Sequence, residues 1–457
     1  MRTSVRVGFA TAAAALLIGG LTAPASSAPQ GAGAARDRVL VFSKTAGFRH
    51  DSIPEGIAAL KELGAAERLA VDTTEDATAF TPGNLARYKA VVFLSTTGDV
   101  LDAAQQKAFE EYVAQGGGYL GVHAAADTEY DWSYYGGLVG AWFQGHPAIQ
   151  PATVRVEDHS HPATRELPAA WQRTDEWYNY RSNPRENVHV LASLDETTYS
   201  GGTMNGDHPI AWCQSYGGGR SFYTGGGHTK ESYADPAFRS HLRGGLQYVT
   251  GRVAANCRPN TGYRNIFNGE TLDGWKQAGP GSFAVRDGTL TSQGGMGLLW
   301  YHAKELTSYS LKLDWKMASA DGDDNSGVFV GFPASDDPWS AVDKGYEIQI
   351  DATDAPDRTT GAIYSFQSAD LAARDKALKP PGEWNSYEIT VRGERLQVFL
   401  NGVKINDFVN KDPERSLASG HIGLQNHGDS DQVSFRKIRL KELAATSDAS
   451  AVSAAGD

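Results

Sequence analysis

Cysteine is scarce in this chain: only two of the 457 residues are cysteine, Cys213 and Cys257. At most one internal disulfide can therefore form, and in an oxidising compartment these two residues are its candidates. Two buried free thiols are the alternative. The place of Cys257 favours the disulfide, because it follows the first predicted domain and a covalent link there would pin the last segment of that domain.

Long hydrophobic runs are absent beyond the N-terminus. Arg2 and Arg6 precede the apolar run GFATAAAALLIGGLTA, and small residues follow it. This order of charge, apolar run and small residues predicts a secretory signal peptide over residues 1–28. The run is too short for a comfortable membrane span, and no later stretch is long enough. We therefore expect a secreted, soluble mature protein without a membrane span, which begins with a mobile lead-in over residues 29–37.

An excess of positive charge is also absent. The 42 Lys and Arg residues are outnumbered by 54 Asp and Glu residues, which gives a formal net charge of -12. This balance argues against binding to nucleic acid or to anionic membranes. The 10 Trp and 19 Tyr residues suit sugar binding, and they equally suit any β-rich core. The oligomeric state is left open by the sequence.

A chain of this length exceeds one hydrophobic core, so two or three domains are expected. From Arg38 onward, the segments RVLVFS, YKAVVFLST and GYLGVHA are typical of strands, and IPEGIAALKELGAA and LDAAQQKAFEEYVAQGG are typical of helices. This alternation predicts an α/β domain over residues 38–251, with a parallel sheet covered by helices on both faces. In such sheets ligands bind beyond the carboxyl ends of the strands.

A second pattern begins after residues 252–262, which we interpret as a linker. Segments such as SYSLKLDWKMA, NSGVFVGF and NSYEITVRG alternate apolar and polar residues, and Asn401-Gly402 indicates a hairpin turn. Many short strands without intervening helices predict an all-β domain over residues 263–443, an antiparallel sandwich or jelly roll. Residues 444–457 are small and polar, which is typical of a disordered tail.

One strand of the second domain carries a row of polar side chains. In the segment GYEIQID, residues 345–351, alternation places Glu347, Gln349 and Asp351 on one face and the apolar residues on the other. We interpret the segment as a half-buried strand. An ordinary solvated sheet face would explain the polar row, and so would a catalytic surface, so the surrounding side chains must decide between them.

Histidine and acidic residues follow several predicted strands of the first domain. The segments KTAGFRHDS, GVHAAAD and TGGGHTKESY each follow a strand, and DEWYNY adds a glutamate. Together with HPIAWCQSYGGGRSFYTG, these segments resemble the ThuA-like family, named for trehalose utilisation, over about residues 38–251. The resemblance implies a flavodoxin-like fold of the class I glutamine amidotransferase type.

This resemblance places His123 on the tight turn where those amidotransferases carry a cysteine. Neither cysteine of the chain lies on this turn, so thiol chemistry of the amidotransferase kind is excluded. His50, His123, Glu176 and His228 could instead bind a divalent metal of unknown identity, because imidazole and carboxylate groups are suitable ligands. His123 could equally be a general base beside a sugar carbonyl. Histidines that only hydrogen-bond loop backbone are the alternative, since no HxxH-type spacing occurs.

The second domain carries the segments IFNGETLDGW, GYEIQID, GEWNSYEITVRG and GHIGLQNHGDSDQVSFRKIRLKEL. Over residues 263–443 these segments resemble the 3-keto-disaccharide hydrolase family, also described as 3-keto-glucoside lyase and hydratase. Members are sometimes grouped with family 16 glycoside hydrolases by likeness of fold. The resemblance implies a concanavalin-like jelly roll and a saccharide substrate.

The resemblance also implies a chemistry for the polar row. A carbonyl at C3 of a glucoside acidifies the hydrogen on C2, so a carboxylate can remove that proton, the C1 oxygen can leave, and water can add back. Glu347 is the candidate base and Asp351 its acidic partner, while Gln349 and Gln425 are candidate substrate contacts. His427 is a candidate acid or metal ligand.

Two other functions remain open for the second domain. One is a lectin-like glycan-binding protein without turnover, in which Trp384 is a candidate for stacking on a sugar, although a core position explains Trp384 equally well. The other is a conventional family 16-like glycoside hydrolase. Retaining hydrolysis needs two carboxyls about 5 to 5.5 Å apart, whereas residues four apart on a strand have Cα atoms about 13 Å apart. The middle acid of the E-x-D-x-E pattern is also replaced here by Gln349.

Overall fold

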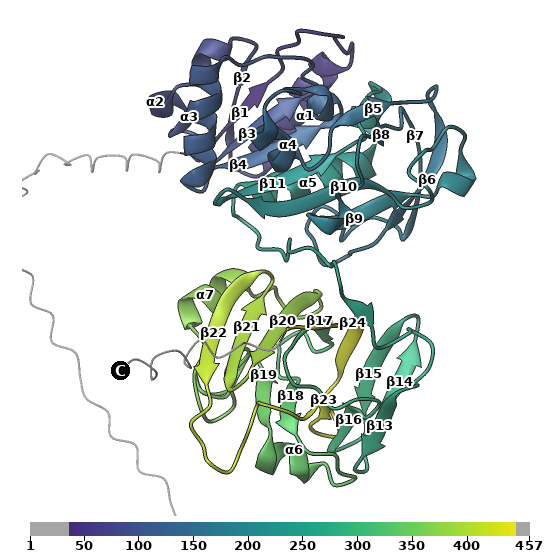
Figure 1. The fold of residues 1–457 in the computed structure, drawn as a ribbon, viewed down its shortest axis with the longest axis vertical. Coiled ribbons are helices and arrows are strands. Elements are labelled where there is room, and N and C mark those ends of the chain that lie inside the picture. Colours follow the sequence, from purple (N-terminus) through teal and green to yellow (C-terminus); the bar gives the residue numbers. More distant parts are fainter. Residues whose placement is uncertain (1–35, 445–457) are drawn as a thin grey trace, which may run out of the picture. The chain divides into compact units, whose positions relative to one another are not determined.

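The computed structural model describes residues 36–444, so the predicted signal peptide and nearly all of the predicted tail lie outside the described residues. Two folded parts follow one another along the chain, and each has its own sheets and its own hydrophobic core (Figure 1). Among the residues that the structure describes, no helix has the length and apolar character needed to cross a membrane.

The N-terminal part contains eleven strands. They are β1 (Arg38–Phe42), β2 (Ala70–Thr74), β3 (Ala90–Leu94), β4 (Gly118–Val122), β5 (Phe143–Gly145), β6 (Gln150–Val156), β7 (Ala170–Asp175), β8 (Asn179–Tyr180), β9 (His189–Leu194), β10 (His208–Tyr216) and β11 (Gly219–Thr224). Nine of them form one sheet with the order β2-β1-β3-β4-β11-β10-β9-β6-β7, and β5 pairs separately with β8.

This sheet is mixed, so the expectation of a parallel sheet holds for only one half of it. Strands β2, β1, β3, β4 and β11 pair in parallel, whereas β10, β9, β6 and β7 are joined by antiparallel pairing. The change of direction occurs at Gly217 and Gly218, which both have positive φ and return β10 directly into β11. A connection this short can join only antiparallel strands, because parallel neighbours need a crossover of a dozen residues or more.

Helices cover both faces of the sheet, as expected. They are α1 (Ile53–Ala66), α2 (Pro82–Leu85), α3 (Ala103–Ala114), α4 (Ser133–Val139) and α5 (Pro236–Val249), with short 3-10 turns η1 (Ala77–Ala79), η2 (His123–Asp127), η3 (Pro184–Glu186), η4 (Glu196–Thr198) and η5 (Glu231–Ala234). Tyr119 and Ser221 hydrogen-bond α4, whereas Leu120 and Phe222, one position further along β4 and β11, pack against α5 near Gly245. Alternation along the strands therefore sends neighbouring side chains to opposite helical layers.

The C-terminal part is an antiparallel β sandwich. Its strands are β12 (Arg264–Asn265), β13 (Trp275–Ala278), β14 (Ser282–Arg286), β15 (Thr289–Gln293), β16 (Gly297–Tyr301), β17 (Tyr309–Met317), β18 (Ser326–Phe332), β19 (Tyr346–Ile350), β20 (Asn385–Arg392), β21 (Arg395–Leu400), β22 (Val403–Val409), β23 (His421–Asn426) and β24 (Val433–Glu442). The first sheet has the order β14-β15-β24-β17-β20-β21-β22, with β12 beside β24, and the second has the order β13-β16-β23-β18-β19.

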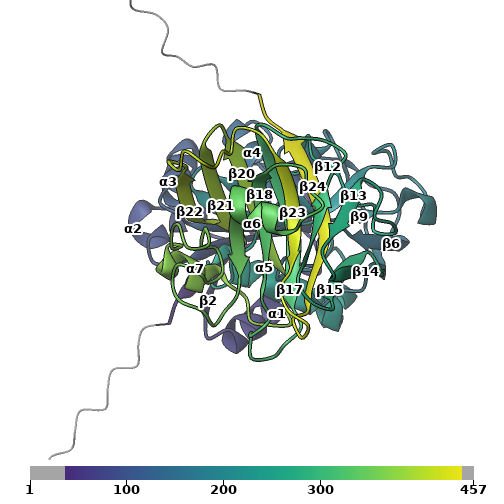
Figure 2. The ribbon, with the colours of Figure 1, turned by 90° about the horizontal axis from the view of Figure 1, so that it is seen from below.

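Apolar residues from both sheets meet in one core between them. Leu311 and Ile389 come from the first sheet, and Val328, Ile348 and Leu424 come from the second. Two short helices, α6 (Trp339–Lys344) and α7 (Leu371–Ala377), complete this part. Figure 2 shows α6 lying over β18, and this helix also contacts β19, so it covers one end of the second sheet's other face. Ala341 of α6 belongs to a small apolar cluster there.

Cys213 and Cys257 form a disulfide with an S–S distance of 1.98 Å. Cys213 lies in β10 and Cys257 follows α5, and both residues are buried in the core of the N-terminal part. The covalent link therefore ties the segment that leaves α5 to a central strand of the sheet.

Candidate functional site

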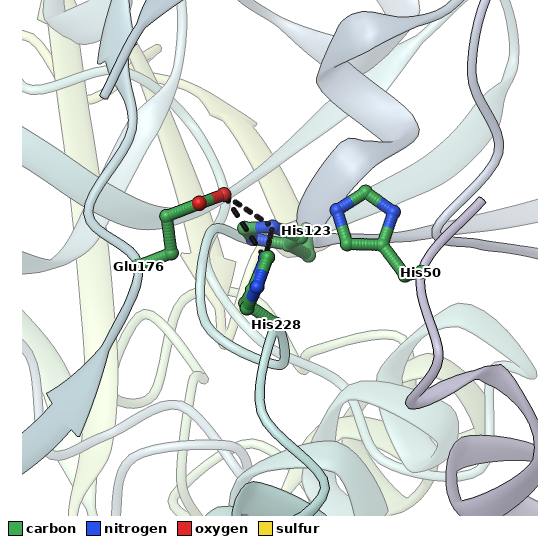
Figure 3. Close-up of side chains that lie close together, drawn as sticks. All are labelled: His50, His123, Glu176 and His228. Carbon is green, nitrogen blue, oxygen red and sulfur yellow. Dashed lines mark hydrogen bonds and ion pairs between the residues drawn. The ribbon is translucent and has the colours of Figure 1, made fainter. Parts of the chain in front are cut away.

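Four side chains from distant parts of the sequence meet at one edge of the N-terminal sheet. His50 lies between β1 and α1, His123 directly follows β4, Glu176 directly follows β7, and His228 lies between β11 and α5. One nitrogen or carboxylate oxygen from each residue lies within 4.8 Å of those of the other three. Figure 3 shows the four side chains directed toward one another. We call this group the histidine cluster.

His123 is held in a fixed orientation by its surroundings. Its φ angle is 51°, a conformation that non-glycine residues rarely adopt, so the chain turns sharply where β4 ends. The hydroxyl of Tyr223 donates to the His123 carbonyl at 2.9 Å, and the ring of Tyr178 lies 4.2 Å from the imidazole, centroid to centroid. Nδ1 of His123 lies 2.8 Å from the carbonyl oxygen of Gly225. Nδ1 therefore carries a proton, and in the neutral ring Nε2 offers a lone pair.

The cluster is compact and largely shielded from water. Nε2 of His123 lies 3.2 Å from Nδ1 of His228 and 3.4 Å from Oε2 of Glu176, and Nδ1 of His228 lies 3.0 Å from the same oxygen. Burial disfavours the charged carboxylate, but the hydrogen bonds and charges of the two imidazoles outweigh this and hold the pKa of Glu176 well below its usual range. Burial, together with the charges of His123 and His228, lowers the pKa of His50 to about 3, so His50 is neutral near pH 7.

Two further residues that the sequence analysis did not assign support the cluster. Asp175, at the end of β7, accepts hydrogen bonds from the backbone N–H groups of Gly227 at 2.8 Å and His228 at 3.0 Å. It thereby positions the loop that carries His228. Nδ1 of His146 lies 3.0 Å from Oε1 of Glu176. Asp175 directly precedes Glu176 in the DEWYNY segment, so that segment could have indicated it as a candidate. No sequence pattern around His146 indicates a role for this residue.

A second group lies on the sheet of the C-terminal part that contains β19. All five residues of β19 are buried, so the interpretation of this segment as a half-buried strand is wrong, and an ordinary solvated face does not explain its polar side chains. The register places Gln349 opposite Gly327 of β18, and the same register places Gln425 of β23 on the other side of Gly327. Because directly paired residues point to the same face, Glu347, Gln349 and Gln425 share a face that lies away from the core between the sheets. We call these three residues the polar row.

The side-chain oxygens of the polar row are short of partners. Oε1 of Glu347, Oε1 of Gln349 and Oε1 of Gln425 are all buried, and none accepts a hydrogen bond within the described residues. Burial raises the pKa of Glu347 to about 8. Buried polar atoms are nearly always paired in folded proteins, so three unpaired oxygens on β19 and β23, which flank β18, indicate a place built for a ligand.

Asp351 directly follows β19, and its carboxylate accepts hydrogen bonds from neighbouring residues. Its Oδ1 accepts from the backbone N–H of Thr353 at 2.7 Å, and its Oδ2 accepts from Nδ2 of Asn325 at 2.9 Å. It therefore orders the turn after β19 and does not pair with Glu347. Asn325 also donates its backbone N–H to Asp431 at 3.3 Å, and Nδ1 of His427 lies 2.8 Å from the same carboxylate. His427 thus lies at the rim of the row, with its side chain half exposed.

Trp384 does not join the polar row. It immediately precedes β20, a strand of the other sheet, and the guanidinium of Arg436 lies 3.9 Å from its ring centroid. The sequence alone could not reveal this separation, because sheet membership depends on which strands pair.

Gly327 leaves the space that the Glu347 carboxylate occupies. A Cβ atom at this position would lie 2.1 Å from Oε1 and 2.6 Å from Cγ of Glu347. We expect Gly327→Ala to displace the carboxylate and to lower kcat/KM of any reaction that uses it by about 100-fold, with a loss of stability of about 1 to 3 kcal/mol from overpacking. Kinetics and urea unfolding measure the two effects. Gly83→Ala is the control, since a Cβ there meets no atom within 4 Å, and unchanged activity in Gly327→Ala would contradict the assignment.

Comparison with known proteins assigns both parts to families. Residues 38–249 match the ThuA family model, described as trehalose utilisation, and residues 262–441 match the model of a 3-keto-alpha-glucoside-1,2-lyase-like domain. A 3-keto-disaccharide hydrolase from Bacteroides thetaiotaomicron is 27% identical over 236 residues, which cover 40% of this chain and 79% of that protein.

Solved structures match each part separately. A protein from Bacteroides uniformis, provisionally described as ThuA-like, is 26% identical with a TM-score of 0.41 and covers 50% of this chain and 95% of its own. A protein from Parabacteroides distasonis, provisionally described as a glycosyl hydrolase, is 23% identical with a TM-score of 0.35 and covers 40% of this chain and 94% of its own.

An α/β domain with a mixed sheet is followed by an antiparallel β sandwich, and the family matches place the chain among carbohydrate-active proteins. More specifically, the chain consists of a ThuA domain followed by a 3-keto-disaccharide hydrolase-like domain.

Proposed function

We propose that the C-terminal domain cleaves 3-keto-glucosides or 3-keto-disaccharides by proton abstraction at C2, elimination and hydration. The observation that carries this proposal is the polar row, in which the carboxylate of Glu347 and the amide oxygens of Gln349 and Gln425 are buried on one sheet face without partners. The family match over residues 262–441 supports the substrate class.

Each residue of the polar row has a place in this chemistry. The Glu347 carboxylate takes the proton from C2, and the electron pair of the C–H bond moves toward the C3 carbonyl to form an enolate. The C1–O bond then breaks, and the departing oxygen takes up a proton, which leaves an enone-type glucal. Water adds at C1 and a proton returns to C2, so the net reaction is hydrolysis. The amide groups of Gln349 and Gln425 hydrogen-bond the sugar oxygens, and His427 supplies a proton from the rim.

A raised pKa suits Glu347 to this role. A carboxylate whose conjugate acid has a pKa of about 8 is a stronger base than an ordinary glutamate. A stronger base is useful here because the C2–H group of a keto sugar is only weakly acidic. The cause of the raised pKa is burial, which disfavours the charged form. Within the described residues Glu347 has no ion-pair partner, which distinguishes it from a structural ion-pair carboxylate.

Direct retaining hydrolysis receives less support from the same geometry. That mechanism needs a second carboxyl about 5 to 5.5 Å away. The next carboxyl along the segment, Asp351, is four residues from Glu347, at a Cα distance of about 13 Å, and its oxygens hold the following turn. The acid–nucleophile pair of a family 16-like hydrolase is therefore not assembled from Glu347 and Asp351.

Two finer points belong to the same proposal. We propose a flavodoxin-like arrangement of the class I glutamine amidotransferase type for the ThuA domain and a concanavalin-like jelly roll for the sandwich. We also propose that the protein is exported, because disulfides such as Cys213–Cys257 form and persist in oxidising compartments. The predicted signal peptide over residues 1–28 is in keeping with export.

Incubation of the full-length protein with a 3-keto-glucoside and, separately, with its unoxidised parent tests the proposed reaction. We expect release of free sugar from the keto compound alone, because only a C3 carbonyl makes the C2 proton removable. In deuterated water the product should carry deuterium at C2, which elimination requires and direct displacement at C1 does not. Release from the parent would instead identify a conventional glycosidase, and saturable binding without product would identify a lectin-like protein.

A further inference from the structure

In the histidine cluster of the ThuA domain, three ligand-type atoms lie closer together than a single shared proton explains. With Nδ1 of His123 bonded to the Gly225 carbonyl at 2.8 Å, Nε2 of the neutral ring presents a lone pair to Glu176, 3.4 Å away. In the neutral ring two acceptors then face one another, and a cation between them satisfies both. A proton bridges only two atoms, whereas His123, His228 and Glu176 converge on one another from three directions.

The distances in the cluster match those between ligands around one metal ion. In a tetrahedral zinc site with bonds of about 2.0 to 2.1 Å, neighbouring ligand atoms are about 3.3 Å apart. The three contacts among His123 Nε2, His228 Nδ1 and Glu176 Oε2 measure 3.2, 3.4 and 3.0 Å. The spacing therefore fits three ligands of a single first-row ion.

His50 supplies the fourth group. Its side chain is buried, its Nδ1 accepts or donates no hydrogen bond within the described residues, and its ring centroid lies 4.9 Å from that of His123 and 5.0 Å from that of His228. Figure 3 shows a ring nitrogen of His50 turned toward the other three residues. The nitrogen that faces them is Nε2, the one farther from Cβ, so a metal ion bound there would give this buried imidazole a partner that the other three residues share.

The residues around the cluster hold its members in place, as the outer partners of metal ligands do. Gly225 fixes the ring of His123, and Asp175 fixes the loop of His228 through two backbone N–H groups. His146 contacts the second oxygen of Glu176 at 3.0 Å, which leaves Oε2 directed at the cluster.

We propose that His50, His123, Glu176 and His228 bind one divalent first-row transition metal of the zinc class. Three imidazoles and one carboxylate favour such a metal over magnesium or calcium, which prefer all-oxygen sites. The other group of ligand-type residues in the described part of the chain contains His161 with Cys213 and Cys257, and its two sulfurs are joined in the disulfide. This metal centre belongs to the ThuA domain and is independent of the reaction proposed for the polar row.

The test uses the full-length protein without a histidine tag, stripped with a chelator and titrated with Zn²⁺ and Co²⁺. We expect one equivalent of metal per chain by mass spectrometry, a rise in Tm with added metal, and the intense visible absorption of four-coordinate Co²⁺. Glu176→Gln keeps the size of the side chain but removes its charge, and we expect it to weaken metal binding by at least about 100-fold. His228→Asn, in a more exposed position, is a second variant should Glu176→Gln fail to fold.

Glu196→Gln is the matched control, because Glu196 also contacts a buried histidine, with Oε1 2.9 Å from Nδ1 of His208, but no second imidazole joins that pair. We expect metal binding by this variant to equal that of the unmodified protein. The proposal is overturned if the stripped protein shows no saturable binding of either metal up to millimolar concentration. It is also overturned if folded Glu176→Gln and His228→Asn both bind metal as tightly as the control, since the ion would then lie elsewhere.

Discussion

Replacing Glu347 by Gln should lower kcat for cleavage of a 3-keto-glucoside by about 100- to 10,000-fold, the range over which a general base contributes. Gln has nearly the same size and hydrogen-bonding capacity as Glu, so the buried site is preserved while the proton acceptor is lost. Substrate affinity should change little, and KM together with direct binding measurements separates the two effects.

Asp351→Asn is the matched control for this variant. It removes a carboxylate from the same segment but leaves the side-chain oxygen that accepts from Thr353, so the turn after β19 can persist. We expect kcat within a few-fold of the unmodified protein. If Glu347→Gln retains activity within a few-fold while Asp351→Asn loses it, then Asp351 and not Glu347 is the base.

Glu347→Gln should also change the pH dependence of both activity and stability. Burial raises the pKa of Glu347 from 4.5 to about 8. The proposed base therefore ionises only in mildly alkaline solution, and kcat/KM should rise with pH toward about pH 8. The unfolded chain ionises this residue near pH 4.5. Between about pH 4.5 and about pH 8 the folded protein therefore binds one more proton than the unfolded chain. The stabilisation from this proton is complete below about pH 4.5 and is lost as pH rises through about 8. Over this range the free energy of unfolding should fall by up to about 1.4 kcal/mol per pH unit. Urea unfolding across this range should show that slope in the unmodified protein and its loss in Glu347→Gln.

Removal of the Cys213–Cys257 disulfide should cost about 4 kcal/mol of unfolding free energy. The two residues are 44 positions apart, and closing a loop of this length restricts the unfolded chain by about that amount. Both cysteines are buried in the ThuA domain, so we expect the double variant Cys213→Ala/Cys257→Ala to lower the unfolding midpoint of that domain. Denaturant unfolding of the oxidised protein and the variant measures the difference.

The unmodified protein in a reducing agent serves as the companion measurement, because it loses the bond while both side chains stay in place. Its stability should lie close to that of the double variant, with the remaining difference due to the smaller alanine side chains. Cleavage of a 3-keto-glucoside by the folded double variant should be unchanged, since the polar row belongs to the other domain. A loss of stability below about 1 kcal/mol would mean that the bond does not restrict the unfolded chain as the loop-closure argument requires.

Local pattern was enough to predict many of the elements. The segment IPEGIAALKELGAA predicted a helix that coincides with α1 (Ile53–Ala66), and alternation in GYEIQID predicted β19 (Tyr346–Ile350). Asn401 and Gly402 both have positive φ between β21 and β22, as a two-residue hairpin turn requires. These features follow from neighbours in sequence, because side-chain periodicity and backbone conformation are set over a few residues.

The candidate sites were predictable only in part. Their members could be found because His50, His123 and His228 follow strands whose carboxyl ends meet at one sheet edge. The contribution of His146 and the commitment of Asp351 to a turn could not be found, since both depend on contacts with residues that no sequence pattern links to them. The separation of Trp384 from Glu347 has the same cause.

The sequence by itself determined the order of the two domains, the strand and helix character of most segments, and the residue types available for chemistry. Tertiary structure alone decided that the ThuA sheet is mixed, that both faces of β19 are buried, and that this burial raises the pKa of Glu347. The physical reason is that alternation specifies which side chains share a face, whereas burial and pKa depend on what covers that face, and the covering groups come from distant parts of the chain.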